Sequence, residues 1–167
     1  MAAAATVSAV DDRAAGDDRG EPLDPDRWRW LAAAVLVEEG MGGELGLTFV
    51  DEAAMAALNE RHMGHDGPTD VLSFPLDGED GPAAGDRADD DVPRLLGDVV
   101  ICPSVAARNA PGPVDDELAL LVVHGVLHVL GWDHAADDER EAMQARERHH
   151  LQRWRQRLVA DGETARR

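Results

Sequence analysis

Three histidines at the end of a long apolar segment constrain the fold of this chain more than any other feature. His124, His128 and His134 stand at relative positions 0, 4 and 10, directly after the leucine, alanine and valine residues 118–123. A separation of four residues places the first two rings on one face of an α-helix. Gly131, which lies between the second and third histidines, can adopt the positive φ that ends a helix. The sequence therefore predicts a buried helix and a turn that gathers the three imidazoles.

This pattern indicates a catalytic type of metal site and argues against a peptidase. Three neutral imidazoles with an open fourth position are the ligand arrangement of catalytic zinc. Metallopeptidases of the H-E-x-x-H type carry their general base, a glutamate, directly after the first histidine. This chain has Gly125 at that position, which disfavours a peptidase or amidase. We expect one Zn²⁺ bound by His124, His128 and His134, although imidazoles also accept nickel, copper or iron.

Composition indicates a single cytoplasmic domain. The chain has 167 residues, enough to bury a core of its own. It contains no run of about 18 apolar residues and no basic N-terminal region of a signal peptide, so we expect no membrane association. The single cysteine, Cys102, leaves no internal disulfide and fits a reducing compartment. We expect it to be buried as a small apolar side chain.

The negative charge of the chain is unevenly distributed. The net charge is -18, yet residues 140–167 contain eight arginines against four acids. From charge alone, we expect this arginine-rich end to be a solvated helix face. Overall repulsion would weaken binding to any nucleic acid. A nucleic-acid partner would therefore need local basic surface, such as the last helix.

Periodicity and capping signals predict a mixed fold. Helices are expected from Asp26 to the break at Gly40–Gly43, at 52–62, from Pro103, over the first two histidines and at 137–159. Strands are expected at 45–50, 71–74 and 95–102. The fold class is therefore α+β, with a small mixed β-sheet of about four strands, packed by about five helices, and a zincin-like metal helix. The other histidines, His62, His65, His149 and His150, are expected at the surface.

The same reading divides the chain into a domain and two tails. Residues 1–22 are rich in alanine, aspartate and glycine and are expected to be a disordered tail. Residues 23–160 are expected to form the single domain, with an acidic loop at 77–93. Residues 161–167 are expected to be a C-terminal tail.

Three sequence blocks resemble the YbeY family of bacterial rRNA maturation factors and metallo-endoribonucleases. The blocks are Leu58-Asn59 with residues 67–75 (GPTDVLSFP), residues 96–101 (LGDVVI) and residues 124–134 (HGVLHVLGWDH). They occur in the order and spacing of that family, over about residues 25–158. The third block is the most specific, because glycine follows its first histidine.

The resemblance implies a function that spacing and composition do not reach. It implies a zinc-dependent endoribonuclease, a hydrolase that cuts single-stranded RNA. It further implies maturation of the 16S rRNA 3′ end, late ribosome quality control and the small ribosomal subunit as partner, in the cytoplasm. The zinc ligands that it implies are again His124, His128 and His134.

The catalytic residues stay open at this level. Many family members carry an arginine six residues before the threonine of the first block, where this chain has Met63. Arg61 is a candidate replacement, but a shift of two residues points it elsewhere on a helix. Asp133 is the candidate proton acceptor, and its favoured role is to orient a ligand histidine. The alternative function is a non-catalytic ribosome-assembly factor with a structural zinc, although such a zinc usually has four protein ligands.

Overall fold

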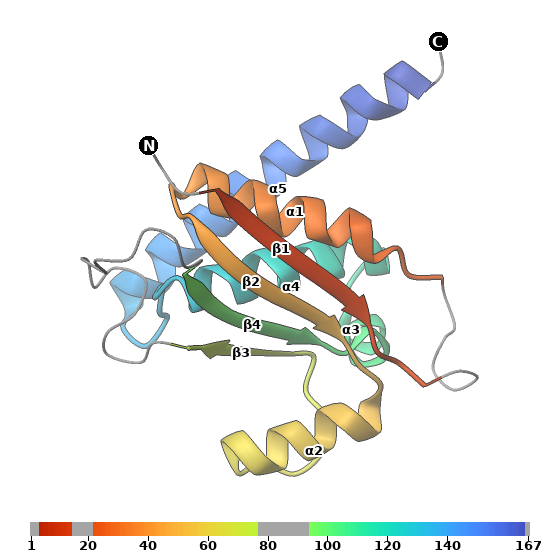
Figure 1. The fold of residues 1–167 in the computed structure, drawn as a ribbon, viewed down its shortest axis with the longest axis vertical. Coiled ribbons are helices and arrows are strands. Elements are labelled where there is room, and N and C mark those ends of the chain that lie inside the picture. The colour runs from red at the N-terminus through yellow and green to blue at the C-terminus, as the bar shows by residue number, and fades with distance from the viewer. Residues whose placement is uncertain (1–3, 15–21, 77–93, 166–167) are drawn as a thin grey trace.

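A computed structural model describes residues 4–14, 22–76 and 94–165 of the chain (Figure 1). The elements are β1 (Ala5–Asp11), α1 (Pro25–Glu38), β2 (Gly43–Phe49), α2 (Glu52–Met63), β3 (Val71–Pro75), β4 (Leu95–Ile101), α3 (Pro103–Asn109), α4 (Val114–Val129) and α5 (Asp137–Ala165). The predicted acidic loop at 77–93 lies outside the described residues. The elements confirm the α+β class with a small mixed sheet. None of the described helices is long and apolar enough to cross a membrane.

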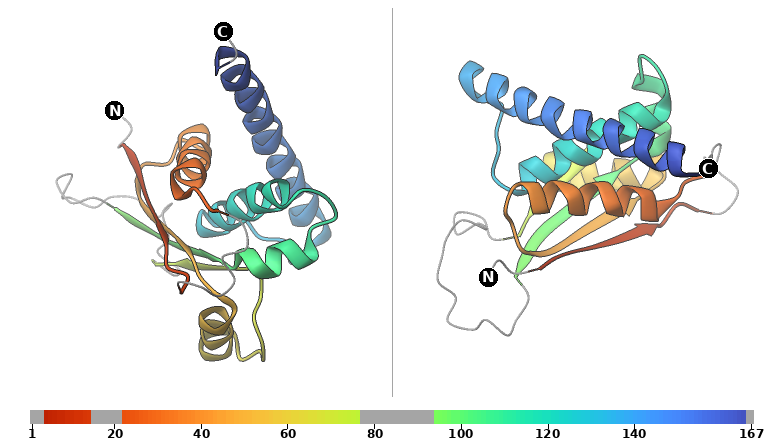
Figure 2. Two further views of the ribbon diagram at one scale, coloured as in Figure 1. Left: turned by 90° about the vertical axis from the view of Figure 1, so that its right-hand side faces the viewer. Right: turned by 90° about the horizontal axis from the view of Figure 1, so that it is seen from above.

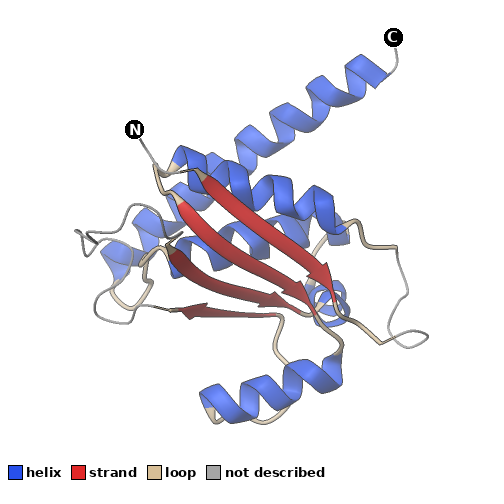
Figure 3. Ribbon diagram, in the orientation of Figure 1, coloured by secondary structure: helices blue, strands red, loops and turns tan. Residues whose placement is uncertain are grey.

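The sheet combines parallel and antiparallel pairing (Figure 3). Its strand order is β1-β2-β4-β3. β1 and β4 both pair in parallel with β2, and β3 runs antiparallel to β4 at the other edge, with Ser73 opposite Val99. The side chains of β3 therefore alternate between the two faces of the sheet at the edge where the histidine helix lies.

Most helices cover one face of the sheet (Figure 2). α1, α4 and α5 lie on that face, and their apolar side chains form one large core with Leu47, Val99 and Ile101. α2 packs against the opposite face of the β3–β4 pair, where Met55 and Leu72 belong to a second, smaller core. The two cores follow from the alternation of strand side chains, because adjacent strand residues point to opposite faces.

Helix α1 begins and packs as its sequence suggests. Asp24 caps the helix by accepting the Asp26 backbone N–H at 3.1 Å, and Pro25 occupies the first turn. Trp28 is fully buried, and its ring centroid lies 6.5 Å from that of Trp154 on α5. This aromatic contact joins α1 to α5 across the core.

The prediction that residues 1–22 form a disordered tail is wrong for the segment that becomes β1. Ala5–Asp11 pairs with the whole of β2, and Val7 is buried in the main core. The short side chains of this segment give a weak strand signal, and the pairing with β2 supplies the hydrogen bonds and the apolar contact that the segment lacks by itself. Arg13, directly after the strand, is also buried and is held by the Asp11 carboxylate.

Helix α5 is longer than predicted, and some of its residues are less exposed than predicted. It continues to Ala165, so residues 161–165 of the expected C-terminal tail at 161–167 are helical, and the last two residues lie outside the described part of the chain. His150 is buried rather than exposed, with 4% of its surface accessible. The arginine-rich face is only partly solvated, because Arg146 and Arg153 form ion pairs with Glu39 and Glu38 of the α1 C-terminus. Expected surface positions are confirmed for His62 and His65.

Candidate metal centre

The three histidines of the motif meet at the C-terminal end of α4. One ligand atom from each of His124, His128 and His134 lies within 4.8 Å of the other two. Their ring centroids are 4.5, 4.9 and 5.9 Å apart, and the rings are steeply inclined to one another. Among the residues that the structure describes, this is the one group of three or more histidine, cysteine or carboxylate side chains close enough to share an ion.

A tight turn after α4 brings the third histidine back. Gly131 has φ of 99°, the left-handed conformation that glycine tolerates best. Its N–H donates to the His128 carbonyl at 3.0 Å, and the Trp132 N–H donates to the Leu127 carbonyl at 3.0 Å. This pair of bonds is the Schellman termination of a helix. The reversal therefore follows from the glycine, as the sequence predicted.

Close packing against the sheet explains the residue after the first histidine. A Cβ added at Gly125 would lie 2.5 Å from the Val99 Cγ1 atom, and Val99 is fully buried in β4. On the same side, the Ser73 hydroxyl of β3 donates to the Gly125 carbonyl at 3.1 Å. A glutamate at this position would point into the sheet. The sheet therefore leaves no room for a peptidase base at this position, and α4 packs closely against β3 and β4.

A carboxylate on α5 orients the first histidine. His124 Nδ1 lies 2.5 Å from Glu147 Oε1, and Glu147 is 8% exposed. A carboxylate only accepts hydrogen bonds, so this contact requires a proton on Nδ1 and leaves Nε2 with its lone pair for a metal. Sequence reasoning missed Glu147. The sequence does contain a hint of its role, because Glu147 falls on the same inward-facing side of the helix as the buried residues Met143, His150 and Trp154.

The remaining two ligands have different surroundings. Burial, together with the neighbouring His124 and His134 rings, lowers the pKa of His128 and favours the neutral form that binds metals. His134 is exposed, and its backbone N–H donates to Asp133 Oδ1 at 2.7 Å. This bond, followed by the His134 ring contact at 3.5 Å, lowers the pKa of Asp133. Asp133 therefore binds the His134 backbone with a shorter hydrogen bond than it makes with the His134 ring.

Met63, which stands where many family members have an arginine, and the candidate replacement Arg61 both lie on α2 and not on the histidine helix. Arg61 and Met63 are both exposed near the end of α2, on the opposite face of the β3–β4 pair from α4. Arg61 forms no hydrogen bond or ion pair with any residue in the described part of the chain. No hydrogen bond or ion pair in the described part of the chain therefore joins Arg61 to the three histidines.

The donor set fits a metal ion. Three imidazoles with adjacent ligand atoms are typical of catalytic zinc, and Glu147 supplies the carboxylate that commonly supports a ligand histidine. A fourth protein ligand is absent from the described residues around the cluster. Cys102 is buried in the smaller core, as expected of a small apolar side chain. The expected ligand trio can therefore hold a metal ion with a coordination position left open.

A solved structure shares the fold of this chain. The solution structure of a Thermotoga maritima protein matches with a TM-score of 0.58 and 24% sequence identity, covering 85% of this chain and 90% of that protein. At this identity the match supports the architecture alone.

Sequence relatives identify the family. Proteins named Endoribonuclease YbeY match from Thermobifida fusca (44% identity, 85% of this chain, 93% of the relative) and Salinispora tropica (44%, 83% and 93%). A third, from Acidothermus cellulolyticus, is 47% identical over 80% of this chain and 86% of its own. The family model described as Endoribonuclease YbeY matches residues 23–155. The predicted family is thereby confirmed, and with it an enzyme of the RNA-cleaving hydrolase class: the chain belongs to the Endoribonuclease YbeY family.

Proposed function

We propose that this protein is a zinc-dependent, single-strand-specific endoribonuclease that acts in maturation of the 16S rRNA 3′ end and in late ribosome quality control. Its partner is the small ribosomal subunit and its compartment the cytoplasm. The observation that carries the proposal is the convergence of His124, His128 and His134 in a member of an endoribonuclease family. The net charge of -18 supports a ribosome-bound substrate, since free RNA is repelled by most of the surface.

The chain positions the ligands and leaves the chemistry to a bound cation. When bound, zinc would supply the positive charge that stabilises a phosphodiester under attack and would lower the pKa of a bound water. Glu147 fixes the ring orientation and tautomer of His124. Asp133 holds the backbone of His134, and it is the candidate proton acceptor because its lowered pKa keeps it ionised. Arg61 remains a candidate for contacting an RNA phosphate, but only if the bound RNA or a partner extends as far as α2.

The number of ligands disfavours the non-catalytic alternative. A structural zinc is usually closed by four protein ligands. In the described part of the chain, the cluster offers three. An open coordination position is expected of a site that meets a substrate.

The decisive experiment compares two histidine variants. We expect His128→Ala to lose the metal, measured by elemental analysis, and to lose cleavage of small subunits that carry 3′-extended 16S rRNA. His65→Ala is the matched control, because His65 is exposed and outside the cluster. It should keep both properties. Cleavage that persists in metal-free His128→Ala would refute the proposed metal chemistry.

A further inference from the structure

A groove between α1 and α5 lies outside the metal centre. It encloses about 590 Å³ and is lined by apolar residues of α1 and by the arginine-bearing face of α5. Trp154 forms part of its floor, whereas Trp30 and Arg157 stand at its rims. In Figures 1 and 2 the C-terminal half of α5 extends beyond the rest of the fold, so this end of the groove opens to solvent.

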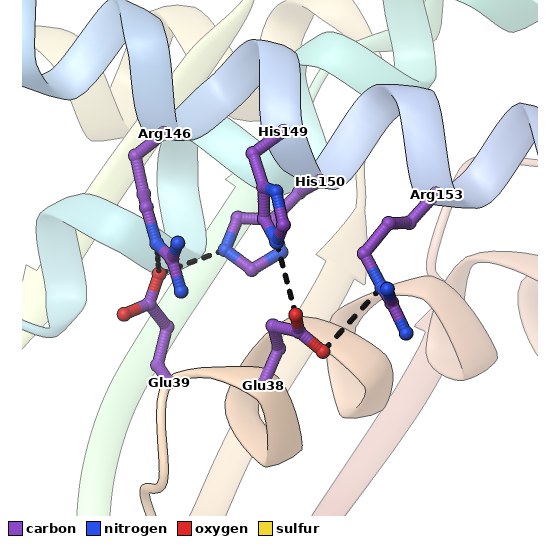
Figure 4. Close-up of polar contacts among 6 residues, drawn as sticks. All are labelled: Glu38, Glu39, Arg146, His149, His150 and Arg153. Atoms are coloured by element: carbon purple, nitrogen blue, oxygen red, sulfur yellow. Dashed lines mark hydrogen bonds and ion pairs between the residues drawn. The ribbon is translucent and has the colours of Figure 1, made fainter.

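The acidic groups beside the groove are already neutralised (Figure 4). Glu38 accepts from His149 Nε2 at 2.9 Å and pairs with Arg153 Nε at 3.5 Å. Glu39 accepts from Arg146 Nε at 2.5 Å and lies 2.7 Å from His150 Nε2. The hydrogen bond from His149 and the charge of Arg153 lower the pKa of Glu38, so it remains ionised and paired. The wall next to α1 therefore repels an anion little.

The groove retains positive charge and exposed aromatic surface. Arg157 lines it and makes no ion pair with a residue in the described ranges. The Trp30 side chain is 61% exposed, although Trp28, two residues earlier, is buried in the core. Val37, about two turns further along the same rim, is 70% exposed. Arginine beside an exposed indole is the combination that holds single-stranded nucleic acid, by phosphate contact and by base stacking.

Charge complementarity decides which partner fits. The whole chain carries a charge of -18, and residues 140–167 are its basic part, with eight arginines against four acids. Two of these arginines, Arg153 and Arg157, line the groove, so a polyanion meets attraction there and repulsion over most of the remaining surface. We propose that the α1–α5 groove is a second binding site for single-stranded RNA, with Trp30 stacking on a base and Arg157 contacting a phosphate.

Helix α5 connects this site to the metal centre. Glu147 contacts His124, His150 lines the groove three residues later, and Arg157 follows after seven more. At about 1.5 Å per residue, Glu147 and Arg157 are separated by about 15 Å along the helix. The groove thus supplies the local basic surface that an acidic ribonuclease requires, and this inference rests on the proposed function.

A matched pair of arginine variants tests the site. Arg157→Ala and Arg155→Ala remove the same charge from neighbouring exposed positions of α5, but only Arg157 lines the groove. Binding of a short fluorescein-labelled oligouridylate is followed by anisotropy in a chelating buffer, so that the readout is independent of the metal and of cleavage. We expect Arg157→Ala to weaken binding several-fold and to reduce the salt slope, d(log K)/d(log[salt]), by about 0.7, as for one lost phosphate contact. Arg155→Ala should change the affinity less than twofold.

A tryptophan variant tests the stacking contact. We expect Trp30→Ala to weaken RNA binding by about fivefold or more, and Trp30→Phe to restore most of the loss. Unchanged thermal midpoints will show that both proteins are folded, as expected for an exposed side chain. Equal affinities of Arg157→Ala, Arg155→Ala and the wild type would overturn the proposal and leave the groove to a protein partner. If the wild type binds RNA and the variants show these binding effects, but the zinc-loaded wild type does not cleave RNA, the groove proposal stands and the proposed nuclease function is contradicted.

Discussion

Replacing Gly125 with alanine tests how closely the histidine helix must approach the sheet. The added Cβ would lie 2.5 Å from Val99 Cγ1 and 3.4 Å from the Ser73 hydroxyl. Carbon atoms in favourable contact are about 3.5–4.0 Å apart, so the two groups must separate by about 1 Å. Val99 is fully buried, and a β-branched side chain has few rotamers to escape into. Helix and strand must therefore move, and with them the base of the metal centre.

The expected cost is the difference between two opposing terms. Overpacking a tight core costs about 1–3 kcal/mol, and the short distance here places the cost near the upper end. Alanine is favoured over glycine inside a helix by about 1 kcal/mol. We therefore expect Gly125→Ala to lower the free energy of unfolding by about 2 kcal/mol. With a urea dependence of about 2 kcal/mol/M, the unfolding midpoint should fall by about 1 M.

A double-mutant cycle identifies the contact responsible. Val99→Ala removes both Val99 Cγ atoms near the added Cβ, at a cost of about 2–3 kcal/mol for lost burial and the cavity. In the double variant the alanine at position 125 fills that cavity, so it should be about as stable as Val99→Ala alone. The cycle should therefore give a coupling free energy of about 2 kcal/mol. Urea unfolding is followed by circular dichroism in chelating buffer, because bound metal would add its own stabilisation.

An ordinary helix glycine provides the control. Gly162 lies in α5, and a Cβ added there would meet nothing within 4 Å. Gly162→Ala should be neutral or stabilising, since only helix propensity acts. If Gly125→Ala is also neutral or stabilising, the steric explanation for the absence of a peptidase-type glutamate is refuted.

Two further predictions concern carboxylates. Glu147→Gln should weaken zinc binding about 10- to 100-fold in chelator competition, whereas Asp133→Asn should have a smaller effect, because its contact with the His134 ring is 3.5 Å long; equal effects would contradict the assigned roles. The bonds from Arg108 and Ser104 lower the pKa of Glu52 from 4.5 to about 2. This carboxylate therefore stabilises the fold above about pH 4.5, and its contribution is lost as the pH falls toward 2. Urea unfolding of Glu52→Gln should show a smaller loss of stability across this window than the wild type, and identical pH profiles would rule out this ion pair as a cause.

The elements that the sequence predicted correctly are those whose signals are local. The spacing of His124 and His128 is a property of one helix, and the reversal at Gly131 needs only the few residues around it. Asp51 likewise caps α2 by accepting the Ala54 N–H at 2.9 Å, three residues away. Helix and strand boundaries differed by a few residues, which is the ordinary fraying of element ends.

The parts that were missed depend on contacts between distant segments. β1 contains short side chains and becomes a strand only through pairing with β2, more than thirty residues later. Glu147 lies 23 residues from His124 in the sequence, and the two side chains come into contact only when α5 packs on α4. His150 was expected at the surface because its partner Glu39 is 111 residues away in the sequence. A charged or titratable residue on an inward helical stripe was the available signal in both cases.

The two carboxylate positions around the histidine helix explain why a peptidase-like ligand set can serve another reaction. A glutamate at position 125 would have to occupy the space of Val99, so the sheet excludes it. The carboxylate that the histidines do have, Glu147, is buried behind His124 and bonded to its Nδ1 atom. From that place it orients a ligand and has no path to a substrate water. A reaction at this site would therefore need a proton acceptor on the exposed side of the cluster, where Asp133 lies. An RNA strand carries its own nucleophile, the 2′-hydroxyl adjacent to the phosphate, whereas a peptide carries none. That hydroxyl must give up its proton as it attacks, and Asp133 is the candidate that would accept it.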